Sequence, residues 1–278
     1  MTHTPRTLRD LLERHGLAAS RALGQNFVVD PNTVRRIARL ANVGPGTHVL
    51  EIGAGLGSLT LALVETGASV TAVEVDRYLL PVLADVVADH PVRVVAGDAM
   101  ELDWDDVLAG SDRWVLVANL PYNVATPLVL DLLAGVPAIE RMLVMVQKEA
   151  GERLAAEPGS RTYGIPSVKV ALRARARLVG TVGPEVFRPR PRVDSALVEV
   201  VRLSEPAVSA DHDLVVELVE TAFNQRRKML RRSLVGLVSA EAFERAGIDP
   251  QGRPEQLGVE AWGRLAEAVQ HDRSPEAT

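Results

Sequence analysis

Short apolar runs alternate with longer amphipathic segments over the first half of the chain. Five apolar runs have the length of β-strands, and they occupy residues 47–52, 69–75, 92–97, 114–119 and 142–147. Helix-like segments lie between them, at residues 58–66, 77–90 and 125–134. Near-continuous apolar strands separated by helices are typical of a parallel sheet covered on both faces, whose ligands bind beyond the carboxyl ends of the strands. We therefore predict an α/β fold with a site at that edge.

The segments that flank this pattern predict further elements. Asp30 followed by Pro31 is typical of a helix start, and this helix should extend to about Ala41. Helix-like and then strand-like patterns follow Gln147, at residues 148–156, 177–182 and 196–203. Beyond residue 206 only helical patterns remain, at residues 211–224, 226–237, 240–246 and 260–269, before a polar tail from about residue 271. These patterns predict a sheet domain over residues 1–203, with an N-terminal helical extension, and a small all-α domain over residues 204–278.

Composition removes several classes of function. The chain has 278 residues and no cysteine, which excludes disulfides, cysteine-ligated metals and a thiol nucleophile. Its six histidines never stand four residues apart, so no helical metal-binding pair is expected. No apolar run approaches the roughly 18 residues of a membrane span, and no apolar stretch follows the N-terminal charges. We expect a cytoplasmic, monomeric protein without a bound metal.

The net charge of −5 argues against a nucleic-acid partner, whereas the distribution of charge allows one. Of the nine Lys and Arg residues after residue 203, five fall within seven positions: Arg226, Arg227, Lys228, Arg231 and Arg232. A local basic cluster can contact phosphates whatever the net charge. A solvated helix face explains the cluster equally well when it is taken alone.

A glycine-rich turn follows the first predicted strand, with the sequence E-I-G-A-G-L-G over residues 51–57. Glycines let the backbone turn sharply and approach a ligand that a Cβ atom would exclude. Glu51 stands before the first glycine, where its carboxylate would repel the pyrophosphate of a dinucleotide. S-adenosylmethionine carries a sulfonium cation and no phosphate, so this turn suits it better.

Acidic residues end the next two predicted strands. Glu74 stands 21 residues after Gly53, where a carboxylate can accept both hydroxyls of a ribose, as it also does in dinucleotide enzymes. Asp98 lies where an adenine amino group would need an acceptor, although a turn aspartate is an equally good explanation of it alone. Together, the three strand ends narrow the class to a cofactor-binding methyltransferase.

The fourth predicted strand ends in Asn119-Leu120-Pro121-Tyr122. The exocyclic amine of a nucleobase is a poor nucleophile because its lone pair is delocalised into the ring. The side-chain oxygen of Asn119 and the carbonyl of Leu120 can accept both amine hydrogens, and Pro121 keeps that carbonyl rigid. Tyr122 offers a ring on which the base can stack, and catalysis then needs positioning and electrostatics without a general base.

Four of the few phenylalanine and tyrosine residues stand in motifs. The chain has four phenylalanines and three tyrosines. Phe187 opens the run F-R-P-R-P-R-V-D-S over residues 187–195, and we expect Tyr122 and Phe187 to sandwich a flipped base. Phe27 and Phe223 lie in two further motifs, G-Q-N-F at residues 24–27 and F-N-Q-R-R-K at residues 223–228.

Taken in order along the chain, these motifs resemble those of the small-subunit (16S) ribosomal RNA adenine dimethyltransferases, over roughly residues 20–260. The resemblance implies a Rossmann-like class I methyltransferase domain with a mostly parallel sheet. It also implies S-adenosylmethionine as methyl donor and N6-dimethylation of two adjacent adenines in a loop near the 3′ end of 16S rRNA. The substrate it implies is a pre-assembled small ribosomal subunit.

The resemblance also implies residue roles, which we carry over by motif. Asn26 and the backbone at Val28 would contact the cofactor, although the family usually has leucine where Val28 stands. Gly53 would approach the methionine part of the cofactor and Glu74 its ribose. Asp98 would accept a hydrogen bond from the adenine amine of the cofactor, and Asn119 would contact both the cofactor and the target amine. The RNA phosphates would be contacted by Arg226, Arg227 and Lys228.

Other functions fit less well. A large-subunit rRNA adenine methyltransferase of the antibiotic-resistance type shares the cofactor motifs, but more often has isoleucine where Leu120 stands and lacks the full run over residues 187–195. An NAD-dependent oxidoreductase is opposed by Glu51 and by the motif at residues 119–122. A non-catalytic assembly factor would have lost motif residues, and every one is present.

Overall fold

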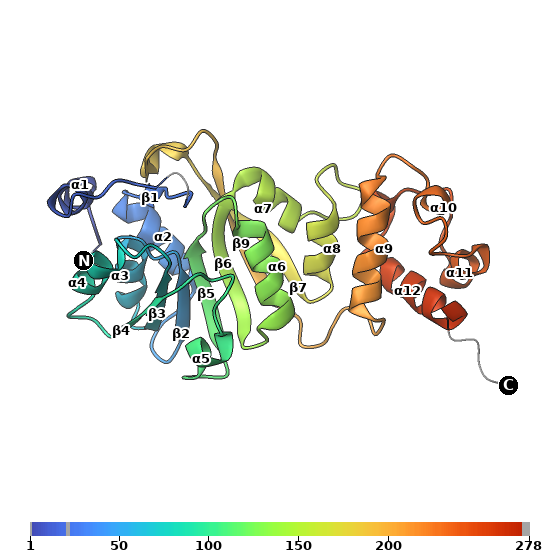
Figure 1. Ribbon diagram of the computed structural model, residues 1–278, viewed down its shortest axis with the longest axis horizontal. Coiled ribbons are helices and arrows are strands. Elements are labelled where there is room, and N and C mark those ends of the chain that lie inside the picture. Colours follow the sequence, from blue (N-terminus) through green and yellow to red (C-terminus); the bar gives the residue numbers. More distant parts are fainter. Residues whose placement is uncertain (1, 21–22, 274–278) are drawn as a thin grey trace. The chain divides into compact units, whose positions relative to one another are not determined.

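The computed structural model describes residues 2–20 and 23–273 (Figure 1). The chain forms two compact units, the first from Met1–Gly151 and Arg177–Arg202, the second from Glu152–Ala176 and Leu203–Thr278. This division differs from the predicted single boundary after residue 203. The reason is that Tyr163, Val168 and Leu172 pack into the helical core of the second unit. The last residues of the predicted polar tail, 274–278, lie outside the described residues.

A seven-stranded sheet with the order β4-β3-β2-β5-β6-β9-β7 forms the centre of the first unit (Figure 1). Its strands are β2 (His48–Ile52), β3 (Ser69–Glu74), β4 (Val92–Ala96), β5 (Trp114–Asn119), β6 (Ile139–Gln147), β7 (Ala174–Val182) and β9 (Ser195–Arg202). β2 to β6 run parallel, and β9 runs antiparallel to β6. The predicted α/β class with a mostly parallel sheet is confirmed.

Helices cover both faces of this sheet. α2 (Pro31–Ala41), α3 (Ser58–Val64) and α4 (Leu80–Val86) lie on one face, where Ile37 and Leu63 pack with Val49 and Val117. α5 (Trp104–Leu108) and α6 (Ala125–Gly135) lie on the other face (Figure 1). α2 begins where predicted, because the Asp30 carboxylate accepts hydrogen bonds from the backbone N–H groups of Asn32 and Thr33 at 3.3 and 2.9 Å. α1 (Pro5–Arg14) precedes it and was not predicted as a separate helix.

Two short strands outside the main sheet join distant parts of the first unit. β1 (Phe27–Val28) pairs antiparallel with β8 (Phe187–Arg188), so that Val28 stands opposite Phe187. The 3₁₀-helix η1 (Pro184–Val186) precedes β8, and the Val186 carbonyl accepts the N–H of Val29 at 2.8 Å. This ladder connects the G-Q-N-F motif to the start of the F-x-P-x-P run.

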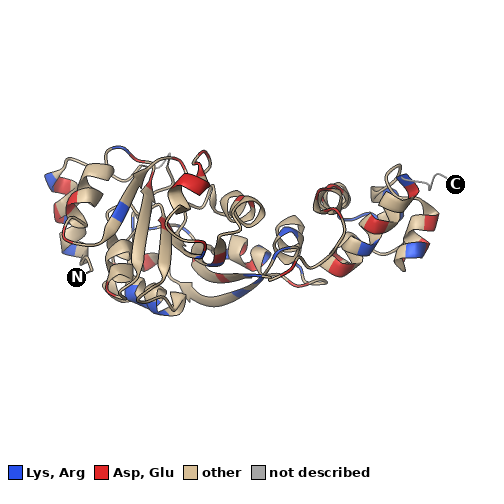
Figure 2. Cartoon of the chain, turned by 90° about the horizontal axis from the view of Figure 1, so that it is seen from below, with Lys and Arg blue, Asp and Glu red and all other residues tan. Residues whose placement is uncertain are grey.

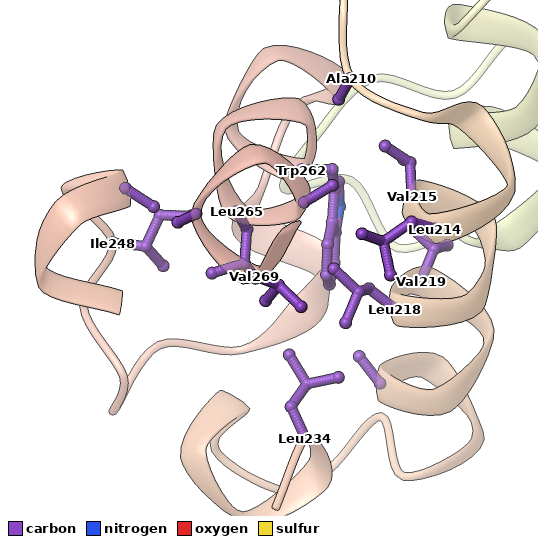
Figure 3. Packing of buried hydrophobic residues seen from close by; sticks show 14 of the residues in the cluster. Ala210, Leu214, Val215, Leu218, Val219, Leu234, Ile248, Trp262, Leu265 and Val269 are labelled. Carbon is purple, nitrogen blue, oxygen red and sulfur yellow. The ribbon is translucent and has the colours of Figure 1, made fainter. Parts of the chain in front are cut away.

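The second unit is helical, as predicted for the C-terminal part of the chain. Its helices are α8 (Ile165–Ala171), α9 (His212–Asn224), α10 (Leu230–Ser233), α11 (Ala240–Ala246) and α12 (Val259–Arg273), with a 3₁₀-helix, η2 (Pro254–Gln256), and the end of α7 (Lys148–Leu154). Trp262 is fully buried between Leu218 of α9 and Leu265 of its own helix (Figure 3). α8 was not predicted, because the Pro and Gly residues around it concealed its short apolar pattern.

The predicted helix over residues 226–237 is wrong. Only Leu230–Ser233 is helical in that range. The N–H groups of Leu230 and Arg231 donate to the carbonyls of Gly252 and Pro250, both at 2.9 Å, instead of to carbonyls one helical turn earlier. A loop that follows in the sequence therefore accepts the first N–H groups of α10, where Arg231 of the basic cluster lies.

Charge is spread over both units. Lys and Arg residues are interspersed with Asp and Glu residues on the elements of each unit (Figure 2). In the described part of the chain, no helix is both long enough and apolar enough to cross a membrane.

Candidate active site

A pocket lies at the carboxyl ends of β2, β3 and β5, where the strand order reverses between β2 and β5. Ligands of open parallel sheets bind at such a reversal. The pocket brings together most of the predicted cofactor and catalytic residues: Asn26, Val28, Gly53, Glu74, Asn119, Leu120, Pro121 and Tyr122. Its described lining contains Glu51 and Glu74 and no Lys, Arg or His.

The glycine-rich turn forms one wall of the pocket. Gly53, Gly55 and Gly57 have φ values of 74°, 58° and 80°, in the left-handed region that favours glycine. At Gly55 an added Cβ atom would lie 3.1 Å from the Phe27 ring, so this glycine lets Phe27 close over the turn. The N–H groups of Gly53 and Ala54 both donate to the Val73 carbonyl, at 2.9 and 3.2 Å, which ties the turn to β3.

Glu74 ends β3 with its carboxylate fixed by backbone donors. Its Oε2 accepts the N–H of Gly55 at 2.7 Å, and its Oε1 accepts the N–H of Asp76 at 2.9 Å. The side chain is 4% exposed, and burial raises its pKa, which the two backbone N–H donors partly offset. Each carboxylate oxygen keeps a second lone-pair direction, so this group can accept two further hydrogen bonds.

Glu51 lies at the base of the pocket, 2% exposed. Its Oε2 has no hydrogen-bond partner among the described residues. Burial raises the pKa of Glu51 to about 8; the charge of Glu74 adds to this rise, and Thr60 opposes it. A buried acceptor without a partner is costly, so this oxygen suits a ligand that brings a donor or a positive charge.

Asn119, the last residue of β5, is oriented by a backbone carbonyl. Its Nδ2 donates to the carbonyl of Asn26 at 3.1 Å, and a carbonyl can only accept. The amide nitrogen therefore faces Asn26, which leaves Oδ1 to accept hydrogen bonds in the pocket. Leu120 is buried and donates its N–H to Met145 of β6 at 3.1 Å, and no hydrogen bond to its carbonyl is found in the part of the chain that the structure describes.

The G-Q-N-F segment packs directly on the loop that follows β5. An added Cβ atom on Gly24 would lie 2.8 Å from Asn123 Oδ1 and 3.3 Å from Pro121 Cβ. Gln25 closes the segment from the other side, with its Nε2 donating to Asp76 at 2.8 Å and its Oε1 accepting the N–H of Ser20 at 2.8 Å. The segment therefore joins the ends of β3 and β5 across the pocket.

Tyr122 lines the pocket and is partly buried. Its hydroxyl lies 2.8 Å from Oγ of Ser195, the last residue of the F-x-P-x-P-x-V-x-S run and the first residue of β9. Burial raises the pKa of Tyr122, which the hydrogen bond to Ser195 partly offsets. The phenol is therefore uncharged at neutral pH, and its ring is available as an apolar face.

Phe187 does not match the expectation that it sandwiches a base with Tyr122. The ring is fully buried in the core beneath α2, with Val34, Ile37 and Val28 in the same cluster. It offers no accessible face for stacking, because β8 turns Phe187 inward where it pairs with Val28. Its part in this structure is to anchor the F-x-P-x-P run.

Asp98 stands apart from the pocket lining. The residue is exposed, and its Oδ1 accepts the N–H of Met100 at 2.9 Å, as a turn aspartate does. It follows β4 at the same sheet edge, because the N–H of Gly97 donates to the Glu74 carbonyl at 3.1 Å. The structure therefore places Asp98 one strand beyond the described pocket residues.

The three predicted RNA-binding cations of the second unit differ in environment. Arg226 donates to the Arg161 carbonyl at 3.1 Å, lies 3.9 Å from the Glu255 carboxylate and sits over the Phe223 ring. Arg227 and Lys228 are exposed. Arg226 is thus part of the packing of its unit, which the sequence pattern did not distinguish from its two neighbours.

Gln25 and Ser195 are site residues that the sequence pattern did not single out, although Gln25 belongs to the G-Q-N-F motif and Ser195 ends the F-x-P-x-P-x-V-x-S run. Neither type of side chain carries an obvious chemical role, and each acts through a partner distant in sequence: Asp76 for Gln25, Tyr122 for Ser195. Only the motif spacing could have pointed to them.

Among residues 2–20 and 23–273, no group of three or more His, Asp or Glu side chains is arranged to hold a metal ion.

Comparisons with known proteins agree with this geometry. The family model for ribosomal RNA adenine dimethylases matches residues 16–271. A ribosomal RNA small subunit methyltransferase A from Kineococcus radiotolerans is 49% identical over 271 residues, which cover 94% of this chain and 89% of that protein.

Solved structures share the fold. The 23S rRNA methyltransferase ErmE superposes with a TM-score of 0.70 at 26% identity, covering 88% of this chain and 100% of that one. A dimethyladenosine transferase from Plasmodium falciparum superposes with a TM-score of 0.74 at 22% identity, covering 88% and 96%. The extent of the family match and the identity to the Kineococcus protein both show that this chain belongs to the ribosomal RNA adenine dimethylase family.

Proposed function

We propose that this protein transfers methyl groups from S-adenosylmethionine to N6 of two adjacent adenines in the 3′-terminal loop of 16S rRNA. The products are N6,N6-dimethyladenosines, made during biogenesis of the small ribosomal subunit. The greater identity to a small-subunit methyltransferase, 49% against 26% for ErmE, favours this substrate over 23S rRNA.

The orientation of Asn119 is the observation that carries the proposal. Because its Nδ2 donates to Asn26, its Oδ1 can accept one hydrogen of an adenine amine, and the Leu120 carbonyl can accept the other. Two acceptors placed in this way favour a pyramidal nitrogen whose lone pair is free for attack. These residues hold the amine in place, and no side chain is needed as a general base.

The pocket fits S-adenosylmethionine by its charge. The described lining has no Lys, Arg or His to bind a phosphate, and the buried carboxylate of Glu74 suits a cation. Glu51 keeps a carboxyl oxygen without a partner, and a cation bound beside it would favour its charged form by lowering its pKa. When bound, this cofactor supplies an electrophilic methyl group. We assign Gly53 to its methionine part, Glu74 to its ribose and the backbone around Asn26 and Val28 to further contacts.

Asp98 is the acceptor that we assign to the adenine amine of the cofactor. Its place after β4, next to the end of β3, supports this assignment. The hydrogen bond from Met100 uses Oδ1, so the assignment requires the other carboxylate oxygen.

The RNA would be bound by both units. We assign the ring of Tyr122 to stacking on the target base, and the exposed Arg227 and Lys228 to backbone phosphates. Arg226 is left out of this assignment, because its guanidinium is already engaged within its own unit.

The experiment that tests the function uses radiolabelled S-adenosylmethionine with undermethylated small ribosomal subunits, and large subunits in parallel. We expect label as N6,N6-dimethyladenosine at two adjacent positions near the 3′ end of 16S rRNA. Label in 23S rRNA would instead assign the protein to the ErmE type of substrate. Cofactor binding without transfer to either subunit would contradict the proposal.

A further inference from the structure

Ser195 lies at the edge of the sheet where the pocket opens. It is the first residue of β9 and stands opposite Gln147, the last residue of β6. Asn119 stands opposite Met145 of the same β6 strand. Because β9 is antiparallel, its first residue reaches the edge that the parallel strands reach with their last residues. Ser195 and the catalytic motif therefore meet across the end of β6.

The hydroxyl of Ser195 has one partner among the described residues, the hydroxyl of Tyr122 at 2.8 Å. Ser195 is fully buried, and the residues after it in β9, Ala196, Leu197 and Val198, are buried and apolar. A hydroxyl in such a setting is costly unless it is hydrogen-bonded, and alanine would fill the position without that cost. The hydrogen bond with Tyr122 explains why position 195 has a serine instead of an alanine.

The contact also determines where the Tyr122 ring lies. A tyrosine has two side-chain torsions, and a hydrogen bond at the hydroxyl restrains the direction of the ring axis. The ring is partly buried and lines the pocket three residues after Asn119. Its placement therefore decides where a base stacked on it presents an amine to Asn119 Oδ1.

We propose that Ser195 is a positioning residue for methyl transfer, which acts by holding the Tyr122 ring in the orientation that presents the target adenine to Asn119. This inference rests on the proposed function and extends it to a side chain that touches neither the cofactor nor the reacting atoms. It also gives a role to the last residue of the F-x-P-x-P-x-V-x-S run, whose first residue, Phe187, is buried.

The test compares Ser195→Ala, Tyr122→Phe and the double variant in methylation of small subunits. Loss of one positioning hydrogen bond should lower kcat by roughly tenfold in each single variant, with the Kd for S-adenosylmethionine unchanged. The double variant should be no slower than either single variant, because both remove the same contact. Ser167→Ala is the matched control: this buried serine donates to the Arg153 carbonyl at 2.6 Å in the second unit, and its loss should leave kcat unchanged.

A second readout does not depend on activity. The chain has three tyrosines, so 3-fluorotyrosine gives three ¹⁹F signals, and Tyr122→Phe identifies the one from Tyr122. Ser195→Ala should shift that signal and leave those of Tyr78 and Tyr163 in place, without a large change in Tm.

The outcomes are separable. Wild-type kcat in Ser195→Ala, an unmoved Tyr122 signal, or additive losses in the double variant would overturn the positioning role while the proposed function stands. A rise in the Kd of Ser195→Ala for S-adenosylmethionine by the same factor as its fall in kcat would also overturn the positioning role. Absence of transfer by the wild-type protein would overturn the proposed function, and the positioning role with it.

Discussion

The side-chain amide of Asn119 donates to the backbone carbonyl of Asn26, 93 residues earlier in the chain, at 3.1 Å. This one contact joins the G-Q-N-F segment to the end of β5. It also decides which end of the amide faces the pocket. The segment around Asn26 therefore takes part in catalysis through orientation, in addition to any contact with the cofactor.

We predict that Asn119→Ala lowers kcat by about 10²–10³-fold, because it removes a preorganised acceptor for the target amine. Affinity for S-adenosylmethionine should stay within about threefold, since the acidic side chains of the pocket remain. Single-turnover methylation and calorimetric titration of the cofactor measure the two quantities. Asn32→Ala, which removes an exposed amide at the start of α2, serves as the control, and an equal loss of cofactor binding and rate in Asn119→Ala would contradict the assigned role.

Glu51 makes the stability of the ligand-free protein depend on pH. Its folded-state pKa of about 8 lies above the usual carboxyl value of 4.5, so the folded protein binds a proton that the unfolded chain has released. This stabilising contribution is complete below about pH 4.5 and is lost as the pH rises through 8. Each unit of pKa difference corresponds to about 1.4 kcal/mol.

Glu51→Gln should therefore raise the Tm by several degrees at pH 8.5 and by much less at pH 5, as measured by calorimetry without cofactor. Glu65→Gln is the matched control with the opposite sign. The hydrogen bond from Arg35 lowers the pKa of Glu65, so its replacement should not stabilise the protein at pH 8.5. A Tm difference for Glu51→Gln that does not vary with pH would rule out a buried neutral carboxyl.

Gly24→Ala should weaken cofactor binding. Gly24 has a φ of 63°, and its added Cβ atom would press on Asn123 and Pro121, which displaces the segment that carries Asn26. If the displaced segment weakens cofactor binding by about 1.4 kcal/mol, the Kd for S-adenosylmethionine rises tenfold. Gly16→Ala tests the strain alone, because Gly16 has a φ of 62° and nothing within 4 Å of the added atom. If both variants bind the cofactor equally well, the close packing of Gly24 is irrelevant to the pocket.

The basic cluster should separate into a structural residue and two docking residues. Arg226→Ala should lower the Tm by roughly 2–4 °C, because it removes the hydrogen bond to Arg161 and the contact with Glu255. Arg227→Ala and Lys228→Ala should leave the Tm unchanged. Each should reduce the slope of log affinity for the small subunit against log salt by about 0.7–0.9.

Arg113→Ala provides the comparison for these binding measurements. Arg113 is a mostly exposed cation that pairs with Glu140 at 2.7 Å, just before β5 begins and hence at the sheet edge opposite the pocket. Its loss should leave the salt slope unchanged. If Arg227→Ala and the wild-type protein have the same salt slope, Arg227 is an ordinary solvated side chain that contacts no phosphate.

The features that the sequence predicted well depend on local chemistry. The strands, the turn at Gly53 and the start of α2 at Asp30 follow from residues adjacent in the chain, and these predictions are confirmed. The convergence of Glu74 and Asn119 follows equally directly, because all parallel strands end at one edge.

Other features depend on pairings between distant segments. Phe187 is buried because β8 pairs with β1, about 160 residues earlier, and no local pattern records that pairing. The helix predicted over residues 226–237 is limited to Leu230–Ser233, and the first N–H groups of this short helix donate to carbonyls of the loop at residues 250–252. The role of Ser195 likewise depends on β9 running antiparallel, which its apolar pattern does not reveal.

The alternation of the two units along the chain has a consequence for synthesis. The ribosome makes β2 to β6 first, then residues 152–176, and only afterwards the strand β9 that brings Ser195 to the pocket. Until α9 and α12 emerge, three apolar residues of this middle segment have no packing partners on those helices: Tyr163, Val168 and Leu172. A chain released after residue 203 would carry a complete set of catalytic motifs and an uncovered apolar surface. Chaperone dependence and aggregation should therefore accompany truncations at that point.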